Sequence, residues 1–381
     1  MSDYYFRTAD LSVGYNGRTL IHDIGISLRA GDILTLIGPN GSGKSTILKS
    51  VTKHLAMIAG DAYIADASVT SMSYKELSQK LAVVLTERIK GELLTCYDVV
   101  ATGRYPYTNT LGLLSPEDHE KVRGAMERVH ALELAEKDFT AISDGQRQRV
   151  LLARAICQEP EIIVLDEPTS FLDIRHKLEL LSILRSMAKE KGITVVMSLH
   201  EIDLAQKVSD KVMCVHGDHI SNFGTPEEIF TEEIIGELYG ITPGTYNTAY
   251  GSVELPPPEG EPETFVISGC GCGVSLYRRL QKENIPFYAG ILFENDLELP
   301  IARALAAEVV TAPAFSPIGD EVFDRAKELL GRCKTVYVTD FPMAEGNARL
   351  RELVDTAQEA GLLLAMETSL KKEEDHADET R

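Results

Sequence analysis

The stretch "LTLIGPNGSGKSTILK", residues 34–49, decides the fold of the first half of the chain. It predicts a strand, a glycine-rich turn and a helix, with the spacing Gly38-x-x-x-x-Gly43-Lys44-Ser45. This is the phosphate-loop pattern in the strand-to-helix context that it requires. Glycines let successive backbone N–H groups converge on phosphate oxygens, and the helix N-terminus adds the positive end of its dipole. The sequence therefore predicts binding of ATP or GTP.

Each polar residue of this loop has an expected task. Lys44 supplies positive charge to the β- and γ-phosphates, and the hydroxyl of Ser45 can ligate Mg²⁺. We expect the loop and the first turn of its helix to bind the nucleotide together, through Gly38, Pro39, Asn40, Gly41, Ser42, Gly43, Lys44, Ser45 and Thr46.

A second motif, "EIIVLDEPTS" at residues 161–170, places an apolar strand before Asp166 and Glu167. Two acids at a strand end are usually only solvated. Beside a phosphate loop, however, Asp166 is a candidate for the magnesium shell and Glu167 for the group that polarises the attacking water.

The segment "ISDGQRQRVLLARAI", residues 142–156, resembles the signature of the ATP-binding cassette (ABC) ATPases of transporters. The resemblance covers roughly residues 4–240 and implies their α/β P-loop fold. The signature of this family usually reads Leu or Ile, Ser, two Gly and Gln. In this chain the corresponding residues are Ile142, Ser143, Asp144, Gly145 and Gln146.

Three further landmarks of this family follow in the expected order. Tyr15 in "SVGYNGRTLIHDI" matches the aromatic residue that stacks on adenine. Asp173 in "SFLDIRHK" matches the loop that crosses to the partner cassette, and His200 in "VVMSLHEIDLA" matches the switch histidine near the γ-phosphate. The resemblance thus implies that Glu167 and His200 are catalytic.

The resemblance also implies a mechanism that needs two chains and uses ATP and Mg²⁺. Ser143, Gly145 and Gln146 of one chain are expected to meet the γ-phosphate held by the Lys44 loop of a second copy. ATP then favours the closed homodimer, and closure is passed to a membrane permease and, indirectly, to a substrate-binding protein.

Two positions depart from the family pattern. Where the family has a magnesium-contacting Gln after the strand of "LAVVLTERIKG", this chain has Thr86 followed by Glu87, which could act through a water. Asp144 replaces a signature glycine and adds a carboxylate near the opposing triphosphate, unless a neighbouring Arg or Lys compensates it.

The segment "DVVATGRYPYT", residues 98–108, resembles importer ATPases for iron–siderophore complexes, haem and cobalamin, in which it lies near the permease-binding face. The alternative is a turn at Tyr105, Pro106 and Tyr107 that only packs against the helical region. We expect an importer subunit whose cargo is set by other components. A soluble single-cassette ATPase acting in metal or cluster assembly is the competing function.

Composition limits the remaining possibilities. The 381 residues exceed what one core usually fills, and a net charge of −20 disfavours nucleic acid as a partner. The N-terminus lacks a signal-peptide pattern and no apolar run is long enough to cross a bilayer. We therefore expect a cytoplasmic chain, peripheral on the inner membrane face through the permease, with its six scattered cysteines reduced.

The chain beyond the cassette is expected to form a second, smaller domain. "LYGITPGTYNTAYGSVELPPPEGEPE", residues 238–263, has linker composition, and the last residues are charged throughout. Alternating strands and helices after the linker predict a Rossmann-like parallel sheet. The expected parts are a cassette over 1–240, a Pro/Gly-rich linker over 241–263, an accessory domain over 264–367 and a charged tail over 368–381.

A second glycine-rich turn opens this accessory domain, in "TFVISGCGCGVSLYRRL" at residues 264–280. A dinucleotide fingerprint needs its third glycine one residue after Gly273, although Glu294 and Asp296 lie roughly where a ribose-binding acid would. A small ligand at Gly269–Gly273, a metal on the cysteines at 270 and 272 with help from Cys333 or the remote His376, and a simple tight corner all remain open.

Overall fold

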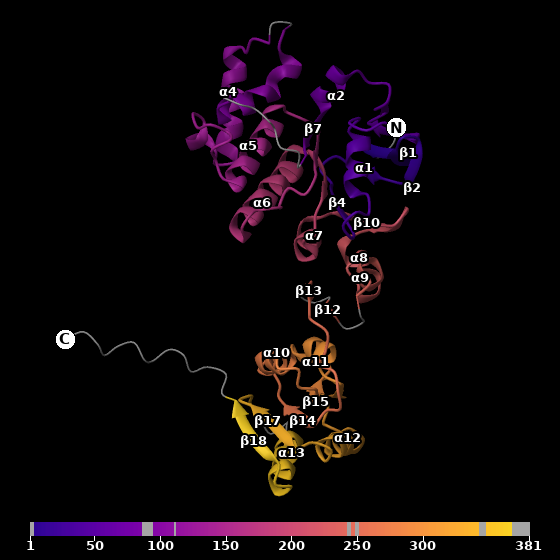
Figure 1. The fold of residues 1–381 in the computed structure, drawn as a ribbon, viewed down its shortest axis with the longest axis vertical. Coiled ribbons are helices and arrows are strands. Elements are labelled where there is room, and N and C mark those ends of the chain that lie inside the picture. The colour runs from indigo at the N-terminus through magenta and orange to yellow at the C-terminus, as the bar shows by residue number, and fades with distance from the viewer. Residues whose placement is uncertain are drawn as a thin grey trace, which may run out of the picture. The chain divides into compact units, whose positions relative to one another are not determined.

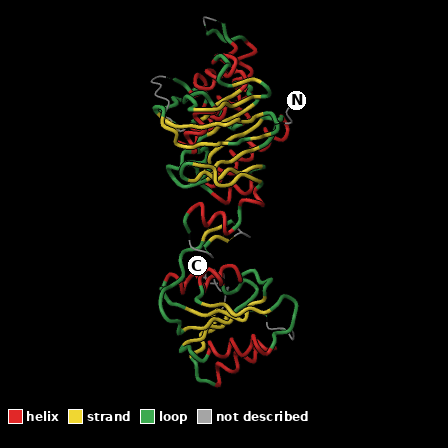
Figure 2. The backbone as a smooth tube through the Cα atoms, turned by 90° about the vertical axis from the view of Figure 1, so that its right-hand side faces the viewer, coloured by secondary structure: helices red, strands yellow, loops and turns green. Residues whose placement is uncertain are grey.

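A computed structural model describes residues 4–85, 94–109, 112–241, 245–247, 251–342 and 348–367. The chain divides into two compact units, residues 1–239 and residues 240–381 (Figures 1 and 2). Thr86 and Glu87, the candidates for a magnesium contact, lie outside the described residues, and so does His376. Among the described helices, none combines the length and the apolar character needed to cross a bilayer.

The first unit is built on a six-stranded sheet of β4 (Ile33–Ile37), β7 (Leu81–Val84), β8 (Ile162–Leu165), β9 (Thr194–Ser198), β10 (Lys211–His216) and β11 (His219–Gly224). Its order is β11-β10-β4-β9-β8-β7, parallel except for the pair β10 and β11. Every side chain of β4, β8 and β9 is buried, as expected for parallel strands covered on both faces. Because β4, β9, β8 and β7 are parallel, their carboxyl ends lie at the same edge of the sheet.

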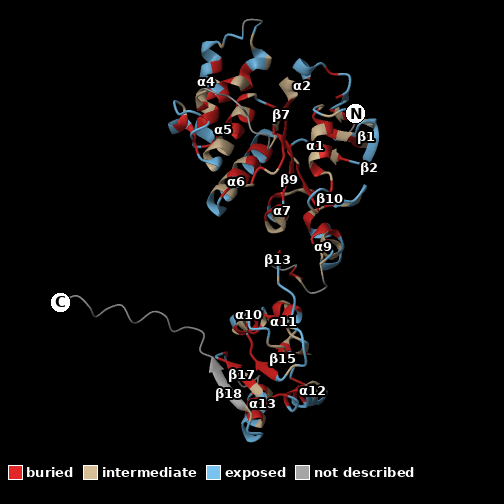
Figure 3. Ribbon diagram, viewed as in Figure 1, coloured by how far each residue is buried: buried red, intermediate tan, exposed pale blue. Residues whose placement is uncertain are grey.

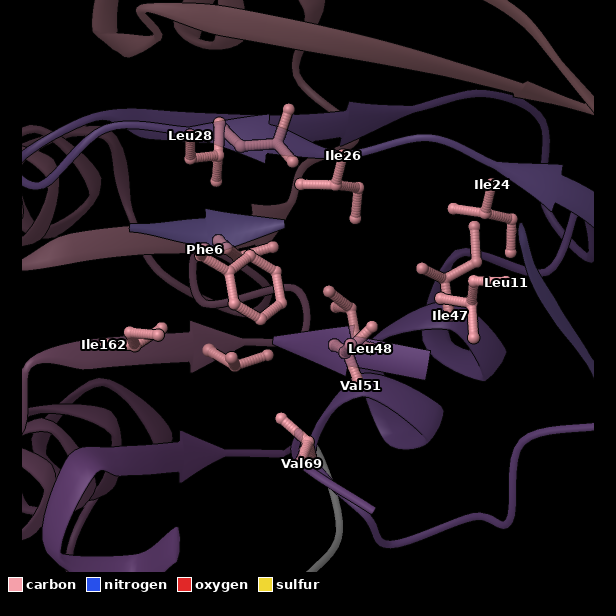
Figure 4. Packing of buried hydrophobic residues seen from close by; sticks show 14 of the residues in the cluster. Phe6, Leu11, Ile24, Ile26, Leu28, Ile47, Leu48, Val51, Val69 and Ile162 are labelled. Atoms are coloured by element: carbon pink, nitrogen blue, oxygen red, sulfur yellow. The ribbon is translucent and has the colours of Figure 1, made fainter. Parts of the chain in front are cut away.

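An antiparallel sheet packs beside it, made of β1 (Phe6–Tyr15), β2 (Arg18–Ile24), β3 (Ser27–Leu28), β5 (Ala59–Ile64) and β6 (Ala67–Ser68). Apolar residues of β1, including Phe6 and Leu11, share a core with Ile47 and Leu48 of α1 (Lys44–Val51) (Figure 4). This core fixes the helix that follows the phosphate loop.

A helical region is inserted between β7 and β8. It consists of α3 (Cys96–Ala101), the 3₁₀-helix η1 (Thr102–Tyr107), α4 (Pro116–Arg128), the 3₁₀-helix η2 (Leu132–Leu134) and α5 (Asp144–Cys157). Thr95, Ser115 and Ser143 begin α3, α4 and α5 with reciprocal capping boxes, which satisfy otherwise unpaired N–H groups. The remaining helices of this unit are α2 (Tyr74–Lys80), α6 (Ile174–Lys191), α7 (Ile202–Val208), α8 (Pro226–Ile229) and α9 (Glu232–Tyr239).

The second unit contains a parallel sheet of β14 (Thr264–Ile267), β15 (Phe287–Phe293), β16 (Glu308–Ala312), β17 (Thr335–Thr339) and β18 (Leu363–Glu367). The order β16-β15-β14-β17-β18 is doubly wound, which confirms the expected Rossmann-like sheet. The chain reverses its direction of winding between β14 and β17, and in such sheets a crevice forms where the strand order reverses. A short hairpin of β12 (Tyr246–Asn247) and β13 (Ser252–Val253) precedes the sheet.

Helices cover both faces of this second sheet, as the alternation of side chains along β14 requires. Phe265 and Ile267 pack with α12 (Asp320–Leu330) and α13 (Ala348–Glu359). Val266 packs on the other face with α10 (Val274–Lys282) and α11 (Leu299–Leu305). Figure 3 shows the buried residues concentrated along β15 and on the inner sides of the helices.

Candidate functional site

The phosphate loop leaves the central sheet at Gly38, directly after β4. Gly38 has a φ of 145°, and a Cβ there would lie 2.2 Å from the carbonyl oxygen of Val215, so only glycine fits. The loop then turns into α1, whose N-cap is Gly43. Asn40 and Gly41 lie exposed at the turn. A bound phosphate can therefore reach the loop backbone from solvent.

Lys44 lies folded against its own loop. Its Nζ donates to the carbonyl oxygens of Gly38 at 2.8 Å and of Pro39 at 2.9 Å. Burial lowers the pKa of Lys44, while the nearby carboxylates of Glu167 and Asp166 oppose that change. The ammonium group thus shares one site with both predicted acids, and triphosphate oxygens are acceptors that can replace the two carbonyls.

Hydroxyl groups in and beside the loop are also placed where a bound nucleotide could contact them. The Oγ of Ser42 is buried and has no hydrogen-bond partner among the described residues, so a phosphate oxygen would satisfy it. At the far end of the loop, the hydroxyl of Tyr15 lies 3.2 Å from Oγ1 of Thr46. Tyr15 ends β1 and is exposed, which leaves its ring face open beside the first turn of α1.

Asp166 is connected to the phosphate loop by hydroxyl groups. Its Oδ1 accepts from Ser45 Oγ at 3.1 Å and from Ser198 Oγ at 2.8 Å. Ser198 can do this because β9, which it ends, lies between β4 and β8 in the sheet. Ser45 and Asp166 are oxygen donors of the kind that Mg²⁺ prefers, so the pair fits the metal that the fold implies.

Glu167 follows Asp166 and is oriented from three directions. Its Oε1 lies 2.6 Å from Nε2 of His200, its Oε2 accepts from Ser170 Oγ at 3.1 Å, and its backbone N–H donates to Ser198 Oγ at 2.9 Å. Glu167 and His200 follow the neighbouring strands β8 and β9, so the structure brings the two predicted catalytic side chains together. Both remain partly exposed and can reach water.

The signature residues lie elsewhere in the unit. The Oγ of Ser143 accepts from the N–H of Gln146, whose side chain accepts from the N–H of Ser143. An added Cβ at Gly145 would touch Leu172 at 3.4 Å, so this end of α5 lies beside the segment that leads to Asp173. Among the described residues, no hydrogen bond or ion pair joins these positions to the phosphate loop, and Figure 1 places α5 and α1 on opposite sides of the unit.

Two acidic residues in this region, the departure Asp144 and the family match Asp173, are held by local contacts. The carboxylate of Asp144 pairs with Nη1 of Arg147 at 2.5 Å, so its extra charge is offset within one helical turn. Asp173 caps α6 by accepting from the N–H of His176 at 2.9 Å, and this hydrogen bond lowers the pKa of the carboxyl group. Both carboxylates are therefore held in place before any partner arrives.

Sequence reasoning missed several residues of the site. Ser198 links Asp166 to Glu167, and only its place at a strand end next to the motif of His200 could have pointed to it. Glu201 accepts from Thr169 Oγ1 at 2.8 Å and pairs with Lys177, which fastens the loop after Glu167 to the loop after β9. Tyr239, far beyond the last motif, contacts Gly38.

A cavity of about 530 Å³ lies between α2, β7 and α5. Its walls include Tyr74, Leu81, Val83, Leu151, Arg154 and Gln158. The predicted importer segment forms part of its surroundings, because Tyr107 donates to the carbonyl oxygen of Gln158 at 3.0 Å. Tyr105 is exposed, so only part of this turn is used for internal packing.

The glycine-rich turn of the second unit is closed by carboxylates. The N–H of Cys270 donates to Asp296 at 2.8 Å, and the N–H of Gly273 donates to the buried Glu298 at 2.7 Å. An added Cβ at Gly273 would lie 2.6 Å from Ser268 Oγ, so this glycine permits a close approach. Two N–H groups of the turn, which a dinucleotide phosphate could otherwise use, are thus occupied by acidic side chains of the chain itself.

Glu298 belongs to a buried polar cluster behind this turn. It is 0% exposed, and it accepts from Tyr277 at 2.9 Å and from Ser268. Burial raises the pKa of both Glu298 and Tyr277. Thr339, at the end of the adjacent strand β17, has a buried hydroxyl without a partner among the described residues. Within the described part of the chain, no cluster of three or more His, Cys, Asp or Glu side chains could hold a metal ion.

Comparisons with known sequences place these features in context. The family described as "ABC transporter" matches residues 21–170, and the "MJ0874 family" matches residues 287–381. An uncharacterized ABC transporter ATP-binding protein of Methanocaldococcus jannaschii, MJ0873, is 39% identical over 287 residues, which cover 75% of this chain and 99% of the relative.

Relatives with named cargo are also similar. The iron(3+)-hydroxamate import ATP-binding protein FhuC of Bacillus subtilis is 36% identical over 234 residues. The matched region is 61% of this chain and 87% of FhuC. The cobalamin import ATP-binding protein BtuD of Halobacterium salinarum is 30% identical, with coverage of 81% and 79%. A solved inward-facing putative metal-chelate type ABC transporter matches 62% of this chain and 88% of its own at 28% identity, with a TM-score of 0.55.

Proposed function

The chain belongs to the ABC transporter ATPases, and from this premise we propose that it powers an importer for iron–siderophore, haem or cobalamin complexes. It is an ATPase. The observation that carries the importer assignment is the similarity of this chain to import ATPases for an iron–hydroxamate complex and for cobalamin. The cargo itself is selected by a permease and a substrate-binding protein.

The site geometry supports a role for each group in hydrolysis. The phosphate loop binds the triphosphate, with Lys44 exchanging its carbonyl partners for phosphate oxygens. Ser45 and Asp166 hold Mg²⁺, which offsets phosphate charge when bound. Glu167 orients and polarises the attacking water, and His200 keeps the carboxylate in position through their 2.6 Å contact.

A homodimer completes this site, because one chain separates its own signature from its own phosphate loop (Figure 1). In the dimer, Ser143 and the N-terminus of α5 face the triphosphate bound by the other copy. The surface beside Asp173 supports this arrangement, since Phe171, Ile174 and Leu178 are 87%, 76% and 53% exposed. Burial of these three large apolar side chains against a partner would remove them from water. A second copy of the chain presents the same residues, so the two surfaces can contact each other in a symmetric dimer.

The permease is proposed to dock at the cavity between α2, β7 and α5, next to the segment 98–108. The charge of Arg154 supports this, because its guanidinium lines the cavity without an ion pair to a described acid and donates to the carbonyl of Val83 at 3.0 Å. Docking there would hold the chain on the cytoplasmic face of the membrane.

We further propose that the second unit senses a cytoplasmic ligand and adjusts transport. The crevice expected where its strand order reverses, together with the orphan hydroxyl of Thr339, supports a binding site. Because Asp296 and Glu298 already occupy the turn, the ligand is not a phosphate anion bound by Gly269–Gly273. Such a ligand can regulate only by favouring one dimer state over another.

Reconstitution tests the importer assignment directly. The chain is co-purified with its permease, identified by pull-down from the native membrane, and placed in vesicles. ATP hydrolysis is then measured with iron–siderophore, haem or cobalamin bound to a substrate-binding protein. Cargo-stimulated hydrolysis and uptake are expected. The importer assignment would be contradicted if the chain hydrolysed ATP without binding any permease and promoted the assembly of metal clusters instead.

The sensory role is tested by a chain that ends at residue 255, studied with the same permease. It should keep basal hydrolysis but lose the response to one compound in a panel of metals, cargo molecules and nucleotides. Identical responses of the full and shortened chains to every compound would refute sensing.

A further inference from the structure

Gly38 is held at both of its backbone polar groups. Its carbonyl oxygen accepts from Nζ of Lys44, while its N–H donates to the phenol oxygen of Tyr239 at 3.2 Å, across 201 positions of sequence. Gly38 is the first residue of the phosphate loop, and the contact with Tyr239 fixes the point where that loop leaves β4.

Tyr239 reaches the loop because its helix is anchored to the sheet. α9 packs through buried Ile235 and Leu238, and it lies against β10. β10 also touches Gly38 directly, since a Cβ there would meet the carbonyl oxygen of Val215. The start of the loop therefore lies against β10, with the phenol of Tyr239 on its N–H.

The contact is independent of pH over the physiological range. Burial raises the pKa of Tyr239 to about 12, although the hydrogen bond from the Gly38 N–H acts in the opposite direction. The phenol thus stays neutral. A neutral phenol oxygen accepts from the Gly38 N–H without adding negative charge next to the triphosphate.

We infer that Tyr239 is a positioning residue for the phosphate loop, which it holds in its nucleotide-binding geometry before the nucleotide arrives. Among the described residues its hydroxyl contacts the Gly38 N–H, and no hydrogen bond joins it to Glu167, so it acts on nucleotide affinity and not on the chemical step. This inference rests on the proposed nucleotide site and adds a residue that none of the sequence motifs contains. Tyr239 is also the last residue of the first unit, so its test uses the full-length chain.

The substitution Tyr239→Phe tests this role because it removes only the hydroxyl group. A neutral hydrogen bond contributes modestly, so the dissociation constant for ADP should rise about three- to ten-fold, with a similar rise in KM for Mg-ATP. The kcat at saturating Mg-ATP should stay within about two-fold, because the chemical groups are unchanged. Calorimetric titration with ADP and steady-state hydrolysis measure the two quantities.

Tyr97→Phe is the matched control, since it removes a phenol that contacts Nδ1 of His119 at 2.5 Å on the helical region. This control should keep the wild-type affinity for ADP. An unchanged ADP affinity in Tyr239→Phe, an equal loss in the control, or a fall in kcat with unchanged KM would each refute the inference. If the wild-type chain itself bound no ADP, the nucleotide site would be refuted instead.

Discussion

The Nε2 atom of His200 lies 2.6 Å from Oε1 of Glu167, across the ends of two neighbouring strands. Ser170 holds the other carboxylate oxygen and Ser198 holds the backbone N–H of Glu167. The carboxylate is therefore oriented before substrate binds, as electrostatic preorganisation requires. Glu167 is accordingly the position where a minimal change should separate hydrolysis from nucleotide binding.

Glu167→Gln should reduce kcat by about 10² or more, because an amide cannot accept a proton from water. Binding of Mg-ATP should persist, since the phosphate loop is intact, and the ATP-bound dimer should accumulate. Glu190→Gln, an exposed change on α6, is the control and should keep normal turnover. Hydrolysis is measured by phosphate release and assembly by light scattering. Undiminished turnover of Glu167→Gln would show that another group activates the water.

The pair of Asp144 and Arg147 provides a second test, at the signature. Arg147→Gln should weaken ATP-dependent dimerisation several-fold, because an uncompensated carboxylate would then approach the opposing triphosphate. Asp144→Gly alone should leave dimerisation at the wild-type level or strengthen it. The double variant should recover most of the loss, and analytical ultracentrifugation with the Glu167→Gln background measures all four proteins. A loss in the double variant equal to that of Arg147→Gln would indicate that Arg147 acts through packing.

The buried contact between Arg104 and Asp118 makes a prediction about stability and pH. Asp118 accepts from the N–H of Ser115 and from Arg104 Nε, and these contacts lower its pKa to about 2. Because the folded-state pKa is depressed, the stabilisation is present above the unfolded pKa of about 4 and is lost as the pH falls toward 2. Asp118→Asn should therefore lower the free energy of unfolding by about 2 kcal/mol at pH 7.

Urea unfolding at pH 7 and at pH 3 measures this difference, which should be smaller at pH 3. Asp203→Asn serves as the control, because Asp203 forms an exposed pair with Lys207 and its loss should change stability little at either pH. A difference for Asp118→Asn that is independent of pH would mean that the charge of Asp118 is not its source.

Sequence patterns predicted the two α/β units because their strands are apolar runs with strong local signals. They also predicted which residues gather at the sheet edge, since parallel strands place their carboxyl ends together. Patterns could not reveal Tyr239, because its contact with Gly38 depends on how α9 packs on β10. Nor could they show that Arg147 offsets Asp144, which is set by side-chain conformation on one helical turn.

The second unit shows a different limit of sequence reasoning. The Gly269–Gly273 turn has the composition of a phosphate cradle, but two of its N–H groups donate to Asp296 and Glu298 from the next loop. Of the two acids expected near a ribose, Glu294 and Asp296, the second instead closes the turn. Only the three-dimensional placement of this loop distinguishes an acid that recognises a ligand from one that closes the turn.

Gly273→Ala should therefore destabilise the second unit without affecting hydrolysis. The φ of Gly273 is −81°, which suits alanine, so any effect comes from crowding. The added Cβ would lie 2.6 Å from Ser268 Oγ and 2.8 Å from Oε1 of Glu298, both in a buried cluster. Overpacking of this kind costs about 1–3 kcal/mol. Gly319→Ala is the control, because its Cβ would meet no atom within 4 Å and its φ is −71°.

Hydrogen exchange of the full-length chain measures the stability of each unit separately and so shows which unit Gly273→Ala affects. Peptides from β14 and β15 should exchange faster in Gly273→Ala, while peptides from β4 and β8 keep wild-type protection, because each unit has its own core. The ATPase rate should stay within about two-fold of wild type. Wild-type protection of β14 in Gly273→Ala would show that the turn can relax, and that Glu298 is not fixed against Gly273 as the hydrogen bond requires.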